Sequence, residues 1–113
     1  MELILDLHGC DLTDISRRKL ENFFDEICRL TEMKRRGRPL WWTEKRRIPH
    51  LHGLSAIQFV TTSNIVCHLL PLLGAAYINV FSCKAFEPRG VARFAKRYWK
   101  ARAIANQRLI VRK

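Results

Sequence analysis

Four side chains that can carry out chemistry lie in or next to one apolar part of the sequence: Ser55, Ser63, His68 and Cys83. The surrounding stretch, residues 58–83, is mostly apolar and predicts strands joined by short turns. A hydroxyl, an imidazole and a thiol are groups that proteins use as nucleophiles and as general acids or bases. Because a buried sheet has little use for these groups singly, we expect the four to meet in one site.

Each of these residues also has an ordinary structural explanation when it is taken alone. Ser63 precedes Asn64, and such a pair is typical of a β-turn. A single histidine on an apolar strand is commonly a hydrogen-bonded core residue, and Cys83 can be a small buried hydrophobe. Ser55 can simply begin a strand. It is the combination of the four that predicts a functional site.

Hydrophobic periodicity indicates the elements that would position these residues. A first strand is predicted over residues 2–8. A helix of about five turns follows, with Thr13 or Asp14 as its N-cap. Four more strands are predicted over residues 40–43, 55–61, 64–70 and 76–82. Pro88 suits the first position of a second helix, and a last short strand covers residues 106–112.

The order β-α-β-β-β-β-α-β predicts an α/β fold, a two-layer sandwich with a largely antiparallel sheet and two helices on one face. The chain has 113 residues, of which 48% are apolar, so we expect one domain over residues 1–113. The other face of the sheet needs a cover. A second copy of the chain is the most economical one.

The four cysteines show neither a CxxC pair nor zinc-ligand spacing, so no metal site is predicted. Cys28 lies on the apolar face of the first helix and Cys67 in an apolar run, which is typical of core residues. Polar residues interrupt the longest apolar run, residues 65–80, which argues against a membrane span. With no secretory signal in view, a reducing cytoplasm is the predicted location.

The chain is strongly basic, with 21 Lys and Arg against 10 Asp and Glu and a net charge of +11. Such an excess favours nucleic acid or another acidic partner. Basic residues recur on one face of the second predicted helix, and tryptophans lie near basic residues, as in single-strand-binding proteins. The residues are Arg89, Arg93, Lys96, Arg97 and Lys100, with Trp41, Trp42 and Trp99. A solvated helix face is the simpler explanation, so a nucleic-acid-binding module is an alternative function.

Three fragments, LDLHGCD, GLSAIQFVTTSNIVCHLLP and GAAYINVFSCK, together resemble one known family. It is the family of small prokaryotic S-adenosylmethionine decarboxylases, pyruvoyl-dependent enzymes of spermidine (polyamine) biosynthesis. The family pattern Glu-Ser-His-x-x-x-His-Thr-Trp-Pro-Glu is matched at Ser63, His68 and Pro71. Its Gly-x-Ser is matched by residues 53–55, and its Asp-x-Phe-Thr-Cys-Gly in part by residues 79–84. The resemblance covers residues 3 to about 101 and implies the same fold and a homodimer.

The resemblance implies that the chain cuts itself between Thr62 and Ser63. Ser63 would attack the carbonyl of Thr62, while Ser55 would stabilise the oxyanion. His68 would then remove the Cα proton of residue 63, so that the ester is eliminated. The products would be chains of 62 and 51 residues, the second beginning with a pyruvoyl group derived from Ser63. That group would accept the electrons released by decarboxylation, and Cys83 would return a proton to the product.

The same resemblance implies a small amino-acid-type substrate, with His8 and Asp11 near it. The sequence departs from the family pattern at Thr62, Asn64, Leu70 and Leu72. Leucine provides neither the aromatic face nor the carboxylate that suits the sulfonium and adenine of S-adenosylmethionine. Two other functions are therefore considered. One is a related decarboxylase for ornithine or arginine, and the other is an uncut, inactive relative that acts as a regulatory partner.

Overall fold

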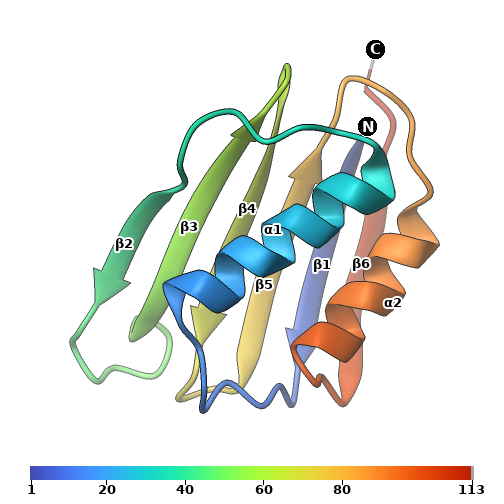
Figure 1. Ribbon diagram of the computed structural model, residues 1–113. Coiled ribbons are helices and arrows are strands. Elements are labelled where there is room, and N and C mark those ends of the chain that lie inside the picture. Colours follow the sequence, from blue (N-terminus) through green and yellow to red (C-terminus); the bar gives the residue numbers. More distant parts are fainter. Residues whose placement is uncertain (113) are drawn as a thin grey trace.

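Residues 1–112, the part of the chain that the structure describes, form one six-stranded sheet and two helices in this computed structural model (Figure 1). The elements are β1 (Glu2–His8), α1 (Arg17–Thr31), β2 (Leu40–Glu44), β3 (Gly53–Val60), β4 (Ser63–Leu70), β5 (Ala75–Phe81), α2 (Pro88–Tyr98) and β6 (Ala103–Ile110). The strands lie in the order β2-β3-β4-β5-β1-β6, and neighbouring strands are antiparallel. Both helices cover the same face. The predicted two-layer α/β sandwich is confirmed.

The first helix begins later than the sequence suggested. Ser16, not Thr13 or Asp14, is its N-cap, and the Ser16 hydroxyl accepts the backbone N–H of Lys19 at 3.0 Å. Thr13 is held in a preceding turn, because both its N–H and its hydroxyl donate to the carboxylate of Asp11. The helix therefore has 15 residues, which corresponds to about four turns.

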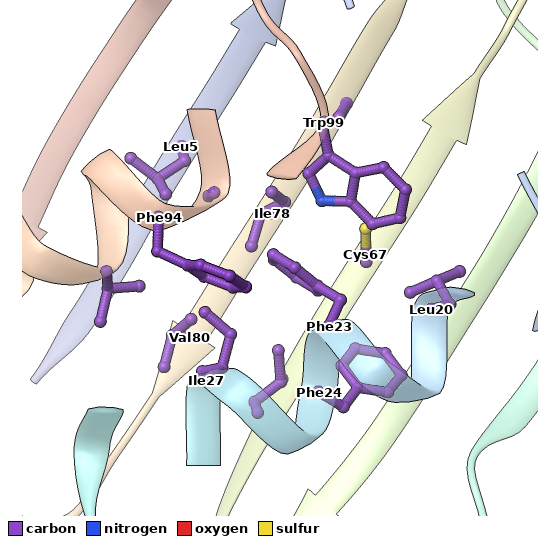
Figure 2. Close-up of a cluster of buried hydrophobic side chains, with 14 of the residues drawn as sticks. Leu5, Leu20, Phe23, Phe24, Ile27, Cys67, Ile78, Val80, Phe94 and Trp99 are labelled. Atoms are coloured by element: carbon purple, nitrogen blue, oxygen red, sulfur yellow. The ribbon is translucent and has the colours of Figure 1, made fainter. Parts of the chain in front are cut away.

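The hydrophobic core lies between the helices and the sheet. Phe23 of α1 stacks on Phe94 of α2 with ring centroids 5.6 Å apart, and the Trp99 ring lies 5.2 Å from Phe23 (Figure 2). Burying one large apolar side chain contributes roughly 1.5–3 kcal/mol, so this aromatic cluster is a major contact between the two helices. Cys67 and Cys28 are both buried in this core, as predicted.

The basic residues predicted for the second helix are exposed on α2 and just after it. Trp99, however, is fully buried in the aromatic cluster. It therefore presents no ring face on which a base could stack, which removes one of the aromatic residues on which the nucleic-acid alternative depended.

The opposite face of the sheet is not covered by any helix of residues 1–112 (Figure 1), and we call it the open face. Large apolar side chains are exposed on its β2–β3 side. Trp42 is 67% exposed and Phe59 52%, and Leu40 and Ile57 are exposed next to them. Extended apolar patches of this kind mark interaction surfaces. This is the face on which the second copy predicted from the sequence would lie.

Within residues 1–112, no helix combines the length and the apolar character needed to cross a membrane. The same residues gather no group of three or more His, Cys, Asp or Glu side chains that could hold a metal ion. The four cysteines are present as free thiols.

Candidate active site

Ser55 and His68 lie side by side on the open face. They are directly opposite one another on β3 and β4, and Oγ of Ser55 is 2.8 Å from Nδ1 of His68. Tyr77 of β5 is directly opposite His68 on the other side. The same line continues to Asp6 of β1 and Asn106 of β6, whose side chains form a 2.9 Å hydrogen bond. A row of polar residues thus crosses the open face, with His68 near its middle.

Gly53 allows β3 and β4 to approach closely next to this row. A Cβ atom on Gly53 would lie only 1.9 Å from the carbonyl oxygen of Leu69. Any other residue would therefore force the two strands apart. Ser55 follows two positions later on β3, so the glycine also fixes the backbone that carries its hydroxyl. The Gly-x-Ser motif thus combines a packing requirement with a polar group.

Partial burial lowers the pKa of His68 below its ordinary value, because removing the ring from water disfavours the imidazolium form. In the tautomer that donates from Nδ1 to Ser55, Nε2 carries the free lone pair. His68 is therefore suited to accept a proton near neutral pH.

Sequence reasoning identified Ser55 and His68, but it missed Tyr77. At the β4–β5 turn, Leu70 pairs with Ala75. Counting two residues away from the turn along each strand would have placed Tyr77 opposite His68.

Ser63 and Cys83 form a separate pair at the other end of β4. The backbone N–H of Cys83 donates to Oγ of Ser63 at 3.1 Å. The Cys83 thiol donates to the carbonyl oxygen of Thr62 at 3.0 Å. Cys83 thus contacts both the hydroxyl and the carbonyl on either side of one peptide bond. Ser63 is only 7% exposed, whereas Cys83 is accessible to solvent.

Thr62 has a backbone conformation that is unusual for its type. Its φ is 57°, in the left-handed region. A β-branched residue is strained there, at a cost of about 1–3 kcal/mol. Thr62 ends the two-residue turn between β3 and β4, in which Val60 pairs with Ser63. Arg36 holds this turn, because its Nε donates to the Thr61 hydroxyl at 2.8 Å. The strain therefore sits directly before Ser63.

Two hollows flank the Thr62–Ser63 peptide bond. The larger, of about 460 Å³, lies beside the C-terminal end of α1 and is also lined by Cys83. The smaller, of about 330 Å³, is lined by Phe59, Asn64 and Phe81; these three residues face one another across β3, β4 and β5. The peptide bond is therefore accessible from both faces of the sheet, at the end where β3 and β4 are joined.

The two pairs do not meet within one chain. Ser63 and His68 are five positions apart on β4, so the alternation of a strand directs their side chains to opposite faces. The burial pattern agrees, because Ser63 is buried and His68 is exposed. Five residues of strand span about 17 Å. The expectation that Ser55, Ser63, His68 and Cys83 converge is therefore wrong for a single chain: Ser55 lies with His68, and Cys83 lies with Ser63.

A further cavity, of about 430 Å³, lies over Ser55 and His68. Trp42, Tyr77 and Glu44 contribute to its wall. Aromatic faces and a carboxylate suit a cationic ligand, and sequence reasoning did not find this combination. Hydrogen bonds from Arg46 lower the pKa of Glu44 to about 2, so the carboxylate is charged at neutral pH but is already paired with a guanidinium.

His8 and Asp11, the two residues predicted less strongly to contact substrate, lie in different places relative to the row of polar residues through His68. His8 ends β1, and its ring lies edge-on to Tyr77 with centroids 6.4 Å apart. Asp11 lies in the loop that follows. Hydrogen bonds from the side chain and backbone of Thr13 lower the pKa of the Asp11 carboxyl. The Asp11 carboxylate is thus engaged in a local turn, and substrate binding by either residue stays a prediction.

Comparison with known proteins identifies the family. The family model described as S-adenosylmethionine decarboxylase matches residues 1–110. The chain belongs to the S-adenosylmethionine decarboxylase family. Its fold is similar to the crystal structure of the adenosylmethionine decarboxylase from Aquifex aeolicus VF5, with a TM-score of 0.72. That match covers 95% of this chain and 84% of that chain at 15% sequence identity.

At such low identity, the Aquifex aeolicus structure supports the fold alone. A comparison with curated protein sequences gives no match. The resemblance detected in the sequence fragments is confirmed by the family match. The S-adenosylmethionine decarboxylase family is one of carboxy-lyases, and this chain is an S-adenosylmethionine decarboxylase-like protein.

Proposed function

We propose that this S-adenosylmethionine decarboxylase-like protein is a pyruvoyl-dependent enzyme that cuts itself between Thr62 and Ser63. The double contact of Cys83 with this peptide bond carries the proposal. Its thiol donates to the Thr62 carbonyl and its N–H donates to the Ser63 hydroxyl. The first contact polarises the carbonyl, and the second holds the nucleophile beside it.

The first step would be attack of the Ser63 hydroxyl on the carbonyl carbon of Thr62. A C–O bond forms, the C–N bond breaks, and the hydroxyl proton moves to the freed amine, so that an ester replaces the amide. The Cys83 thiol would donate to the oxyanion that develops on the Thr62 oxygen. The φ of 57° at Thr62 supports this step, because conversion to an ester releases a strained residue from a tight turn.

His68 and Ser55 would reach the cut from a second copy of the chain. The Thr62–Ser63 bond lines the hollow with Phe59, next to the exposed apolar side chains of the open face. In a two-fold dimer with the open faces packed together, each interface contact occurs twice. The partner's His68 would then approach Ser63, and two complete sites would form. The proposed functional unit is therefore a homodimer.

In that dimer, the partner's His68 would remove the Cα proton of residue 63 and so drive elimination of the ester. Its lowered pKa favours this role, because the imidazole is then neutral at pH 7 and has a free lone pair that can accept a proton. The partner's Ser55 would orient the ring through the contact with Nδ1. Cys83, beside residue 63, is suited to return a proton to the product.

The pyruvoyl group derived from Ser63 would supply the electron-accepting carbonyl that decarboxylation of an amino-acid substrate requires. In the cavity over His68, Trp42 and Tyr77 would contact the flat or cationic part of the substrate. This lining supports S-adenosylmethionine as the substrate and a role in spermidine biosynthesis. Ornithine and arginine, which are also cationic, are the alternatives, and a CO₂-release assay with the three compounds would separate them.

Intact-mass measurement of the purified protein tests the proposal. We expect two chains, of 62 and 51 residues, with the second chain lacking a free amine at its first residue. The Ser63→Ala variant is the matched control and should remain a single chain of 113 residues. A wild-type protein that stays whole under the same conditions would exclude self-processing.

A second candidate function is an uncut relative that regulates an active decarboxylase. Among residues 1–112, the Ser63 hydroxyl is hydrogen-bonded to the Cys83 N–H alone, so no imidazole or carboxylate of the same chain activates it. Thr62 and Asn64 also replace the Glu and His of the family pattern. Co-purification with an active decarboxylase, together with a change in its activity on addition of this chain, would support this alternative.

A further inference from the structure

The cavity beside Cys83 on the α1 side is strongly basic. Lys34, Arg36 and Lys84 contribute to its wall, against one carboxylate, that of Glu32. None of the three cations forms a salt bridge within residues 1–112. The Lys84 ammonium donates to a carbonyl oxygen, that of Glu32, and Arg36 uses Nε on Thr61. Positive charge is therefore left uncompensated in a concave site.

This arrangement differs from that of the solvated basic face of α2. There the cations project from a helix surface, whereas here three basic residues line a hollow of about 460 Å³, within the size range of small-ligand sites. Lys84 also stands where the family pattern quoted above has glycine, which carries no charge. The net charge of +11 would raise the local concentration of anions at such a site.

We propose that this cavity binds a small phosphate-sized anion, and that the bound anion slows cleavage between Thr62 and Ser63. The second part rests on the self-processing described above, whereas the binding itself does not. The cavity also contains Thr62, Ser63 and Cys83. A negative charge there opposes the oxyanion that develops on the Thr62 oxygen, and it neutralises the cations that would otherwise favour it.

Binding is tested with inorganic phosphate on the Ser63→Ala protein, so that cleavage plays no part. Amide signals of residues 34, 36, 62, 83 and 84 should shift saturably in ¹H–¹⁵N spectra, with chloride at equal ionic strength as the reference. Lys84→Gln should weaken binding at least about tenfold, since a hydrogen bond to a charged group is lost. Glutamine can still donate to the Glu32 carbonyl, which preserves the local fold.

Arg47→Gln is the matched control, because it removes one exposed positive charge from the loop that precedes β3, outside this cavity. It should leave phosphate binding within about twofold of the parent protein. Equal weakening by Lys84→Gln and Arg47→Gln, or signal shifts that do not saturate, would overturn the site and leave only general charge attraction.

The effect on cleavage is measured separately with Ser63 restored. Phosphate should slow the appearance of the 62- and 51-residue chains, and Lys84→Gln should remove this dependence. Phosphate that binds but leaves the rate unchanged, or raises it, would overturn the second part. If the wild-type chain never cuts, the self-processing proposal fails, while the spectra of Ser63→Ala still decide whether the anion site exists.

Discussion

Oγ of Ser55 lies 2.8 Å from Nδ1 of His68, and the two residues are directly opposite on neighbouring antiparallel strands. The imidazole is therefore oriented by backbone pairing in the sheet. Tyr77 flanks it on the other side from β5. Because strands of a central sheet are among the most rigid parts of a protein, this orientation should persist through any change at the loops.

The first prediction concerns the pH dependence of stability. Burial lowers the pKa of His68 in the folded state, so the unfolded state takes up a proton at a higher pH than the folded state. Stability from this group is then fully present above the ordinary histidine pKa of about 6.5 and decreases as the pH falls through and below that value. We expect His68→Gln, in the Ser63→Ala background, to show a smaller loss of thermal stability between pH 7.5 and pH 5.

An NMR titration of the histidine ring signals provides the direct check. His68 should titrate below the ordinary histidine pKa of about 6.5. A His68 ring that titrates at or above that ordinary value would contradict the effect of burial.

The second prediction tests whether the site is shared between two chains. Ser63→Ala retains His68 but lacks the nucleophilic hydroxyl, and His68→Ala retains Ser63 but has no base. We expect each variant alone to stay whole, and co-expression to restore cleavage of the His68→Ala chain in mixed dimers. Mass spectrometry distinguishes the two chains. Cleavage by His68→Ala alone, or none in the mixture, would contradict a shared site.

The third prediction concerns the strained turn. Thr62→Gly should stabilise the uncut Ser63→Ala protein by about 1 kcal/mol, because glycine adopts a φ of 57° without the clash that a β-branched residue meets. In the Ser63 protein, the same change should slow cleavage, because less strain is released. Chemical denaturation gives the first value, and the rate at which the two chains appear gives the second.

Thr61→Gly is the control for that turn. Thr61 is not among the residues with positive φ, so glycine there removes the hydrogen bond from Arg36 and relieves no strain. We expect it to destabilise the protein. Stabilisation by both variants would show that general turn flexibility, and not the conformation of Thr62, is responsible.

The fourth prediction is that Gly53→Ala is strongly destabilising. The added methyl group would lie 1.9 Å from the Leu69 carbonyl oxygen, a clash with backbone that no rotamer change relieves. We expect a loss on the order of 2–4 kcal/mol, at the upper end of single substitutions, measured by urea denaturation. Gly37→Ala is the matched comparison. Gly37 has open space around its Cβ position but a φ of 71°, so only backbone strain should appear.

Much of the fold could be predicted from the sequence because the signals were local. Alternating or continuous apolar residues marked the strands, and Pro88 marked the start of α2, as the structure has it. The start of α1 was missed because three nearby residues, Thr13, Asp14 and Ser16, all suit an N-cap. The hydrogen bond from the Lys19 N–H to the Ser16 hydroxyl, which decides among them, is not visible in periodicity.

The candidate site was predicted less well, and the reason is geometrical. The resemblance indicated Ser55, Ser63, His68 and Cys83 but not which of them are neighbours. The predicted strand began at residue 64 and left Ser63 in a turn, whereas β4 begins at Ser63, so that side-chain alternation directs residues 63 and 68 to opposite faces. The strain at Thr62 depends on the turn between β3 and β4. The cations near Cys83 are brought there in part by the loop after α1. No motif in the sequence identified this turn or this loop.

The short turn between β3 and β4 has a consequence for the life of the molecule. Once it is cut, the pairing of β3 with β4, and of β1 with β5 and β6, would keep the two fragments associated, with no covalent link at the tip. Denaturation would then release two separate polypeptides, and renaturation would become a bimolecular reaction that slows on dilution. Maturation of this protein would thus be irreversible. The chain must fold before it is cut, and a mature molecule that unfolds would rarely refold.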